Sequence, residues 1–320
     1  MFGGYEEKFV VSMLEDIWVA RQPSTVRRYC YALTKLFSFC YLFFDKVELP
    51  ISAIRLAKYL VFQKESGASK SGITTIFVAL KWAHGFFPGV TRFNCPLEQK
   101  FLAKLKDSAV RNIIARANRK EPITGRIIGR LLEGLSDDAT VEELRDVLMP
   151  AIAYSLLLRF DELSHLNCLY MSNTERGIKF LIPSSKTDVF REGKNVFLAR
   201  DEGSLSVAKL LLSYMGKAGL KFGSNQFLFS KVSRGRMLNE KVAYSSYLKL
   251  VKDKMAALGF EPEFYGTHSM RSGGATDLAP KVTEFELRLS GRWKDPRSIQ
   301  AYVKVSDERR FNISESLFLN

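Results

Sequence analysis

Histidine and cysteine are scarce in this chain. Its 320 residues include three histidines, His84, His165 and His268, and four cysteines. There is no Cys-x-x-Cys pair, no His-Glu-x-x-His motif and no calcium-binding loop, and no glycine-rich phosphate loop is present either. These absences exclude the common metal centres and nucleotide-binding motifs, so we expect no cofactor. We interpret His84 as a packing residue and the cysteines as reduced, mostly buried thiols.

Long apolar runs are also absent. Stretches such as 151–158, in which Ser155 is the one polar residue, extend over about eight residues, whereas a membrane-spanning helix needs about 20. The first ten residues lack the basic region, apolar stretch and cleavage site of a signal peptide. We therefore expect an intracellular protein.

Basic residues are in excess. The formal net charge is +14, from 48 Lys and Arg against 34 Asp and Glu. Residues 1–120 hold 19 basic and 9 acidic residues, a net charge of +10, so the remaining 200 residues contribute +4. A basic domain of this kind usually binds a polyanion, most often DNA or RNA. The alternative is a surface that is merely rich in lysine.

The first third of the chain predicts an all-helical domain over residues 1–110. In 24–44 the apolar residues recur at helical spacing and predict one buried stripe, and Ser24 is suited to cap the helix. Its members are Val26, Tyr29, Leu33, Phe37, Cys40 and Phe44. Arg27, Arg28 and Lys35 lie off this stripe and are candidates for phosphate contact. Further helices are predicted at 52–65, 71–86 and 97–117.

A basic linker is predicted at residues 111–122. The stretch 111–120 is dense in positive charge, and Pro122 restricts the residue before it. The candidate DNA-binding residues of this segment are Arg111, Arg116, Arg119 and Lys120.

The rest of the chain, 123–320, predicts a mainly α-helical domain with a small antiparallel sheet. Thr124 is suited to cap a first helix that ends near Gly134. Helices are expected at 124–134, 141–158, 204–215, 240–258, 268–278, 283–290 and 296–303, with a tail helix after 306. Short strands rich in apolar residues are expected at 169–172, 178–183 and 195–198.

His268 and Arg271 stand three residues apart, which on a helix places them on one face. Thr267 is suited to be the N-cap, so that His268 falls in the first turn, where free N–H groups and the helix dipole favour an anion. The small residues 272–275 would let this helix approach another backbone closely. A phosphate fits such a corner, although an ordinary capped helix has the same pattern.

Further charged and aromatic residues lie before and after this pair in the chain. Arg159 and Glu162 come directly after the apolar run, where a buried charge needs a partner, and Lys186 lies at the expected tip of a hairpin. Gly291-Arg292-Trp293 is followed by Tyr302, nine residues after the tryptophan.

This ordered set resembles the signature of the tyrosine recombinases, the family of phage integrases and related site-specific recombinases. The sequences 24–40 and 121–124 also resemble the opening of that family's core-binding domain and the start of its catalytic domain. The resemblance therefore covers essentially the whole chain and implies the tyrosine recombinase fold. Most members carry histidine where Trp293 stands, and we expect no counterpart of the extra arm-binding domain of some phage integrases.

The resemblance implies a mechanism. Tyr302 would attack the scissile DNA phosphate to form a 3′-phosphotyrosyl link, while Arg159 and Arg271 hold its non-bridging oxygens. Lys186 would act as the general acid, and His268 would exchange the proton of the nucleophile. Because an indole N–H only donates a hydrogen bond, Trp293 would position a phosphate oxygen or pack against the backbone. Glu162 would orient Arg159 or its neighbours.

The family resemblance also implies partners. The expected partner is double-stranded DNA, bound by a dimer on each site and a tetramer in synapsis, and the tail 303–320 is expected to dock on a neighbouring protomer. The motifs look most like those of recombinases from eukaryotic mobile elements of the DIRS and Crypton types, which would place the protein in a nucleus; a prokaryotic source would place it in the cytoplasm. Two alternatives remain: a type IB topoisomerase, and a domesticated DNA-binding protein without catalysis.

Overall fold

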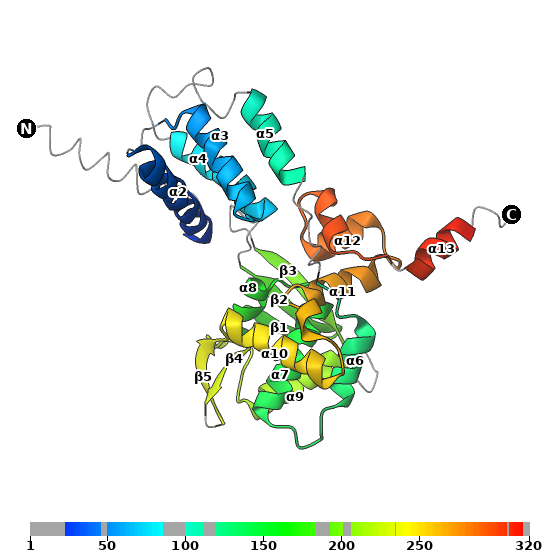
Figure 1. Cartoon of the computed structure of the whole chain (residues 1–320). Coiled ribbons are helices and arrows are strands. Elements are labelled where there is room, and N and C mark those ends of the chain that lie inside the picture. The colour runs from blue at the N-terminus through cyan, green and yellow to red at the C-terminus, as the bar shows by residue number, and fades with distance from the viewer. Residues whose placement is uncertain are drawn as a thin grey trace, which may run out of the picture. The chain divides into compact units, whose positions relative to one another are not determined.

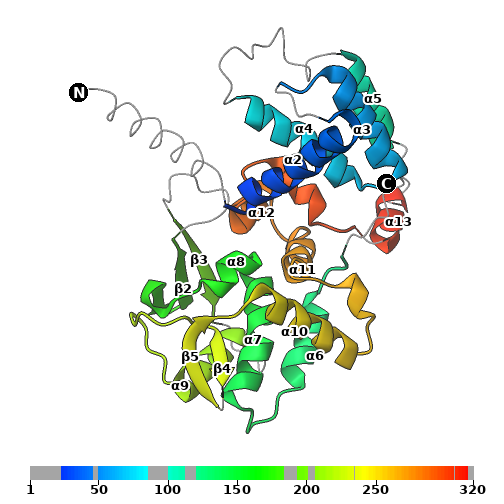
Figure 2. The same ribbon diagram turned by 60° about the vertical axis from the view of Figure 1, so that its left-hand side comes forward.

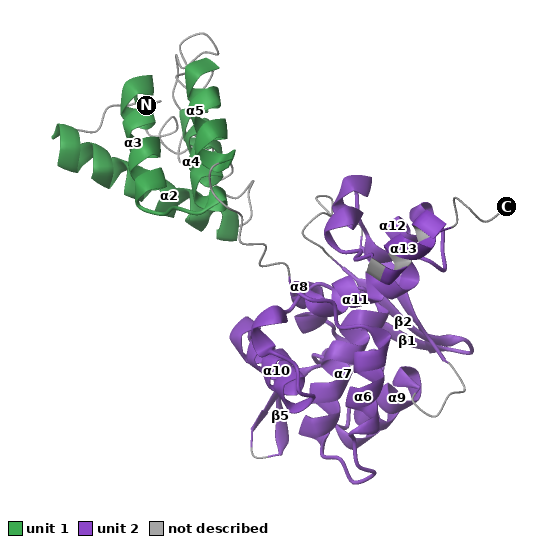
Figure 3. Ribbon diagram, turned by 45° about the vertical axis from the view of Figure 1, so that its right-hand side comes forward, with its two compact units in different colours: residues 1–117 green, residues 118–320 purple. Residues whose placement is uncertain are grey.

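The computed structural model divides the chain into two compact units, residues 1–117 and 118–320 (Figure 3). The described residues are 23–45, 50–85, 100–111, 120–183, 193–200, 206–233, 235–305 and 307–315. The division falls inside the segment 111–122 that we expected to be a linker, most of which lies outside the described residues. The roles expected of the two domains stay predictions.

The described secondary-structure elements of unit 1 are all helices. It contains α2 (Pro23–Phe44), α3 (Ala53–Glu65), α4 (Lys70–His84) and α5 (Lys100–Arg111), close to the expected bounds (Figure 1). Serine side chains cap the N-termini of two of these helices: Ser52 Oγ accepts the N–H of Arg55, and Ser69 Oγ accepts that of Gly72. The helices close over one apolar core.

The predicted stripe of α2 is the face that enters this core. Val26, Tyr29, Leu33 and Cys40 are buried, whereas Phe37 and Phe44 are half-buried. The three candidate basic residues, Arg27, Arg28 and Lys35, are all exposed. Burial of one apolar stripe is what stabilises such a helix, so its charged face is left to solvent or to a partner.

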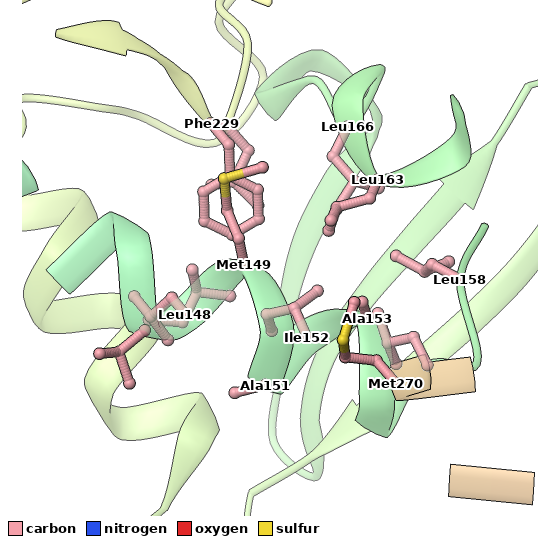
Figure 4. Close-up of a cluster of buried hydrophobic side chains, with 14 of the residues drawn as sticks. Leu148, Met149, Ala151, Ile152, Ala153, Leu158, Leu163, Leu166, Phe229 and Met270 are labelled. Atoms are coloured by element: carbon pink, nitrogen blue, oxygen red, sulfur yellow. The ribbon is translucent and has the colours of Figure 1, made fainter. Parts of the chain in front are cut away.

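Unit 2 is mainly helical, built around α7 (Val141–Ser155). Apolar residues on every side of α7 are buried, including Leu148, Met149 and Ile152, and Phe229 and Met270 lie in the same cluster (Figure 4). The surrounding helices are α6 (Gly125–Glu133), α9 (Val207–Lys217), α10 (Tyr244–Ala257), α11 (Ser269–Leu278) and α12 (Glu284–Gly291). A tail helix, α13 (Asp307–Glu315), follows near the C-terminus.

Two separate antiparallel sheets complete the described part of unit 2 (Figure 2). The first has the order β1 (Met171–Thr174), β2 (Gly177–Ile182) and β3 (Lys194–Ala199). Phe180 of β2 is opposite Met171 and Val196, and all three side chains enter the core. This sheet was predicted, and so was the fold class: a mainly α-helical chain with a small antiparallel sheet.

The second sheet was not predicted. It pairs β4 (Ser230–Ser233) with β5 (Arg236–Lys241), and β5 occupies the start of the range 240–258 where we expected helix. That expectation was wrong at its N-terminal end. Most of β5 is exposed, so its residues lack the alternation of apolar and polar side chains that identifies a half-buried strand.

The end of α7 also differs from the expectation. The helix stops at Ser155, because Leu157 adopts a left-handed backbone with φ 49°, and a short helix α8 (Phe160–Ser164) begins after Arg159. A left-handed conformation is uncommon for a residue with a side chain and costs free energy. The turn redirects the chain after α7, so that Arg159 and Glu162 lie together at the start of the short helix α8.

The glycine pair of α11 lets this helix pack closely against its neighbours. A Cβ on Gly273 would lie 1.8 Å from the carbonyl oxygen of Ile123, and one on Gly274 would lie 2.4 Å from that of Tyr154. The expectation of close backbone approach is therefore confirmed. Asp277 strengthens the contact, since its Oδ2 accepts the Gly125 N–H at 2.6 Å and the Tyr154 hydroxyl at 2.8 Å. Asp277 thus caps α6, whereas Thr124 at the N-cap position makes no side-chain cap bond.

Among the helices that the structure describes, none has the length and apolar character needed to cross a membrane. The described residues also contain no group of three or more His, Cys, Asp or Glu side chains that could hold a metal ion.

Candidate active site

The candidate site lies where the ends of several elements of unit 2 meet. The turn after α7 supplies Arg159, and α8 supplies Glu162. The helix α11 supplies Arg271, and the turn after α12 supplies Trp293. Tyr302 follows directly after the 3-10 helix η4 (Pro296–Ala301).

A small apolar cluster holds these elements together. Its buried members come from the turn after α7, from α11, from α12 and its following turn, and from η4: Leu157, Ala275, Leu287, Trp293 and Ile299. The side chains of Tyr302 and Val303 pack against it and are half-buried. Burial of this cluster brings together residues that are more than 130 positions apart in the sequence.

Glu162 is the acceptor around which the arginines gather. Its side chain is only 2% exposed. Oε1 accepts from Arg159 Nη1 at 2.7 Å, and Oε2 accepts from Arg292 Nη2 at 2.8 Å and from the backbone N–H of Arg159 at 3.0 Å. Arg271 Nη1 lies 4.0 Å from Oε2. One carboxylate therefore faces three guanidinium groups, and the cluster keeps a formal charge of +2.

Burial raises the pKa of Glu162, but Arg292, the Arg159 N–H, and the charges of Arg159 and Arg271 outweigh this effect and hold the pKa below its usual value. For Arg271, burial is the largest cause of a pKa below the usual value, and the charges of Arg159 and Arg292 lower it further. An anion bound beside these groups would oppose that repulsion. The cluster is therefore suited to stabilise negative charge.

Arg271 is wholly buried in the folded chain. Nη1 donates to the Leu157 carbonyl and Nη2 to the Gly291 carbonyl, while Nε has no hydrogen-bond partner among the described residues. Its Cζ lies 4.6 Å from the centre of the Trp293 ring and 5.1 Å from that of the Tyr302 ring. The guanidinium is therefore held between backbone acceptors and two aromatic faces.

Trp293 is buried beside this arginine. Its ring leaves no room for a side chain at Gly291, where a Cβ would lie 1.8 Å from the indole. The indole N–H finds no acceptor within the described part of the chain. A buried donor without a partner is costly, and a ligand oxygen would satisfy it. Both roles that the sequence left open for Trp293, packing and donation to a phosphate, are compatible with this position.

Tyr302 lies against both aromatic and basic neighbours. Its ring centre is 5.3 Å from that of Trp293 and 6.2 Å from that of His268. The backbone of the segment is anchored to α11, because the hydroxyls of Ser272 and Thr276 both donate to the Tyr302 carbonyl. The side chain remains half-exposed, so the hydroxyl is not sealed inside a core.

His268 is exposed at the start of α11. It is itself the N-cap residue, so the expectation that Thr267 caps this helix was wrong. The first helical backbone bond runs from the Ser272 N–H to the His268 carbonyl, so the helix begins one residue later than expected. The Ser269 hydroxyl accepts the N–H of Gly266 at 3.0 Å and secures the turn before the helix.

Lys186, Arg116 and Arg119 lie outside the described residues. Arg111 is exposed at the end of α5, and Lys120 is exposed and donates to the backbone carbonyl of Glu263. The roles assigned to all of them stay predictions.

Arg292 is a site residue that sequence reasoning missed. It is the middle residue of the Gly-x-Trp motif, between Gly291 and Trp293, but we assigned it no role. Its place within that motif was the signal that could have identified it. Nothing in the local pattern indicates that its side chain turns back to Glu162, 130 residues earlier in the chain.

Comparison with curated proteins finds a relative of this chain. An integrase/recombinase xerD homolog from Selenomonas ruminantium is 22% identical over 177 residues, which cover 54% of this chain and 51% of the relative. The match thus spans about half the length of the curated relative. No family model matches the sequence.

Comparison with solved structures finds similar folds over most of the chain. A XerH site-specific recombinase bound to palindromic difH substrate, in a post-cleavage complex, has a TM-score of 0.65 at 17% identity and covers 92% of this chain and 80% of its own. A Tn1549 transposon integrase in complex with transposon right end DNA has a TM-score of 0.62 at 15% identity, covering 90% and 92%. A lambda integrase dimer bound to a COC' core site has a TM-score of 0.59 at 13% identity, covering 92% and 94%.

At these identities the structural matches show the fold, which is the fold predicted from the sequence motifs. They leave untested the expected origin in a eukaryotic mobile element and the expected cellular location.

Proposed function

We propose that this chain, which has the fold of the tyrosine recombinases, is a site-specific recombinase that cleaves and rejoins DNA strands through a 3′-phosphotyrosyl intermediate at Tyr302. The observation that carries the proposal is the meeting of a half-exposed tyrosine with a buried, net-positive arginine cluster, the Tyr302 ring centre lying 5.1 Å from Arg271 Cζ. A nucleophile beside a site for a negatively charged transition state is what phosphoryl transfer requires.

In the proposed reaction the Tyr302 oxygen attacks the scissile phosphorus, and the bond to the 5′ oxygen of the next nucleotide breaks. His268 takes the proton of the tyrosine, and Lys186 gives a proton to the leaving 5′ oxygen. Arg159 and Arg271 hold the non-bridging oxygens, since a planar guanidinium binds a phosphate through two directed bonds. The phosphotyrosyl link conserves the bond energy, so attack by a 5′-hydroxyl of another duplex rejoins the strands without ATP.

The unpartnered donors of the described site support this mechanism. Arg271 Nε and the Trp293 indole N–H are buried and lack acceptors among the described residues. If the Arg271 guanidinium rotates away from its two backbone carbonyls, its N–H groups would donate to phosphate oxygens. The Trp293 N–H would be a further donor. For Trp293 this would be a positioning role, because its indole does not exchange protons near neutral pH.

The experiment that tests the function uses a nicked half-site, in which the leaving strand diffuses away after cleavage. The wild-type chain is expected to form a covalent protein–DNA adduct that survives denaturation, with the DNA attached through its 3′ phosphate. Peptide mapping should place the attachment at Tyr302. A chain that binds such DNA and never becomes linked to it would instead be a binding protein without catalysis.

Two companion assays separate a recombinase from a topoisomerase of type IB. A recombinase is expected to exchange strands between two duplexes that carry its own sites, in the proposed tetramer. A topoisomerase would relax supercoiled DNA as a monomer, without joining two duplexes. Relaxation without strand exchange would therefore reassign the chemistry, while an adduct at Tyr302 would still identify the nucleophile.

We also propose that unit 1 contacts DNA phosphates through the exposed basic face of α2. Replacing Arg27, Arg28 or Lys35 singly by alanine is expected to weaken binding to all DNA sequences alike. Each change should reduce the slope of log K against log salt by about 0.9, because one phosphate contact and its released counterion are lost. The measurement is DNA affinity over a series of salt concentrations.

The matched control for this salt series is Lys221→Ala, which removes an exposed lysine from unit 2. It is expected to leave the salt slope unchanged. An equal loss of slope in the control and the α2 variants would mean that net charge alone, with no contact by α2, sets the binding.

A further inference from the structure

Arg292 adopts a backbone conformation that a residue with a side chain rarely takes. It ends α12 with φ 55° and ψ 40°, in the left-handed region. Glycine is the usual residue at this kind of helix end, because a Cβ crowds the following carbonyl there. An arginine at this position is therefore disfavoured locally, and contacts made by its side chain have to offset that cost.

The Arg292 guanidinium is directed to the segment around Arg159. Nη1 donates to the Leu156 carbonyl at 3.1 Å and to the Ser290 carbonyl at 3.0 Å. Nη2 donates to the Leu157 carbonyl at 2.9 Å and to Glu162 Oε2 at 2.8 Å. Three of the four acceptors thus belong to the turn and short helix that carry Arg159.

Two of these acceptors are shared with the arginines of the proposed phosphate site. The Leu157 carbonyl accepts from both Arg292 and Arg271, and the Glu162 carboxylate accepts from both Arg292 and Arg159. Leu157 itself is left-handed, with φ 49°. A hydrogen bond from the Arg292 side chain to the Leu157 carbonyl therefore joins two residues with left-handed backbones. Such conformations persist where the surrounding structure over-determines them.

We propose that Arg292 is a positioning residue, which orients Arg159 and Arg271 toward the scissile phosphate by occupying one oxygen of Glu162 and the carbonyl of Leu157. This inference rests on the proposed DNA cleavage. Arg292 occupies Glu162 Oε2, so that Oε1 is left to Arg159. It also adds positive charge that opposes a shift of Arg271 toward Glu162.

A lysine at this position would reproduce the charge but only part of the geometry. An ammonium is a compact point charge, whereas the guanidinium of Arg292 bonds four acceptors in different directions from a fixed planar fork. A side chain that served only to end α12 would not require these four acceptors. The conservative variant therefore separates orientation from charge.

The test compares Arg292→Gln and Arg292→Lys with wild type in adduct formation on a nicked half-site. The matched control is Arg288→Gln on the same helix, where the guanidinium lies over the exposed Phe285 ring with Cζ 5.6 Å from its centre. Protein concentration is varied, so that the rate at saturation and the half-saturating concentration are obtained separately. Thermal unfolding of each variant is measured in parallel.

For Arg292→Gln the rate at saturation is expected to fall about 100-fold, the size of loss that a displacement of roughly 1 Å at a reacting centre produces. The half-saturating concentration should stay within about threefold, since phosphate contacts outside the site dominate affinity. Arg292→Lys should recover part of the rate, and Arg288→Gln should match wild type.

A second substrate tests whether the effect reaches the phosphate. When a methyl group replaces one non-bridging oxygen, the scissile centre loses the charge that the arginines hold. The rate penalty of Arg292→Gln is then expected to shrink. An equal penalty on both substrates would mean that Arg292 acts on the fold and not through the arginines.

The other outcomes are also decisive. Should Arg292→Gln fail to fold, a full wild-type rate in Arg292→Lys would overturn the positioning role, and a reduced rate in a folded Arg292→Lys would support it. A wild-type rate in Arg292→Gln overturns the positioning role and leaves the proposed function intact. Absence of an adduct from the wild-type chain under all conditions overturns the proposed function itself, and the role of Arg292 with it.

Discussion

Tyr302→Phe is expected to abolish the covalent adduct with a nicked half-site while leaving DNA binding within about threefold of wild type, because phosphate contacts elsewhere dominate affinity. The phenol oxygen is the only atom removed, and in the proposed reaction it forms the new bond to phosphorus. Loss of a nucleophile lowers the rate by on the order of 10⁴-fold or more, since binding alone cannot replace the bond-forming atom. The measurement is the adduct fraction on a denaturing gel beside a binding titration on the same DNA.

The fold should not suffer from this change. The ring that packs against Trp293, with centres 5.3 Å apart, is retained, and the hydrogen bonds to the Tyr302 carbonyl come from the backbone of that residue. Tyr244→Phe is a suitable control, because Tyr244 is an exposed tyrosine that packs on Phe160. Adduct formation by Tyr302→Phe at the wild-type rate would place the nucleophile elsewhere in the chain.

Glu162→Gln is expected to lower the free energy of unfolding at pH 7 by about 3–5 kcal/mol, the usual effect of removing one partner from a buried ion pair. The carboxylate is 2% exposed and neutralises part of the charge of Arg159, Arg271 and Arg292. An amide of the same shape keeps an acceptor oxygen but leaves three guanidinium groups without a counter-charge. Denaturant unfolding followed by circular dichroism measures the change.

The effect of Glu162→Gln should depend on pH. The pKa of Glu162 is depressed in the folded chain, so the carboxylate stabilises the fold at pH values above its unfolded pKa of about 4.3. That contribution is lost as the pH falls through the lower folded-state pKa, where wild type also becomes protonated. The difference in stability between wild type and Glu162→Gln is therefore expected to be largest near neutral pH and to shrink in acid.

Glu143 offers a matched control for Glu162. It accepts the backbone N–H of Thr140 at the start of α7 as Glu162 accepts that of Arg159 at the start of α8, but it is exposed. Its removal costs a helix cap and no buried charge, so Glu143→Gln should destabilise the fold much less. Equal effects of the two substitutions, or a Glu162→Gln effect that is the same at pH 7 and in acid, would contradict the ion-pair account.

The helices were the most predictable part of this fold. Burial along one helix follows a period that the local sequence displays, as in α2, where Val26, Tyr29 and Leu33 are buried and Arg27 and Arg28 are exposed. The second hairpin was missed because β5 is mostly exposed and has no apolar alternation. The early end of α7 was missed because the left-handed turn at Leu157 has no signal in an apolar run.

For the candidate site, the order and spacing of the motifs selected most of the residues that the fold brings together. Arg159, Glu162, Arg271, Trp293 and Tyr302 meet in one cluster, whereas Lys186 lies outside the described residues. Motifs can identify such residues because chemistry limits which side chains occupy them. Their catalytic roles stay predictions until the adduct and its variants are measured.

The sequence by itself determined which chemical groups the chain has, which helix faces are apolar, and where a glycine pair allows close packing. Only the tertiary structure decided that one carboxylate faces three arginines, that Arg292 is one of them, and that the Tyr302 ring lies against Arg271. The physical reason is that these residues are far apart in the sequence. Contacts between α7, α11 and α12 depend on how whole elements pack, and on left-handed turns at Leu157 and Arg292 that local propensity disfavours.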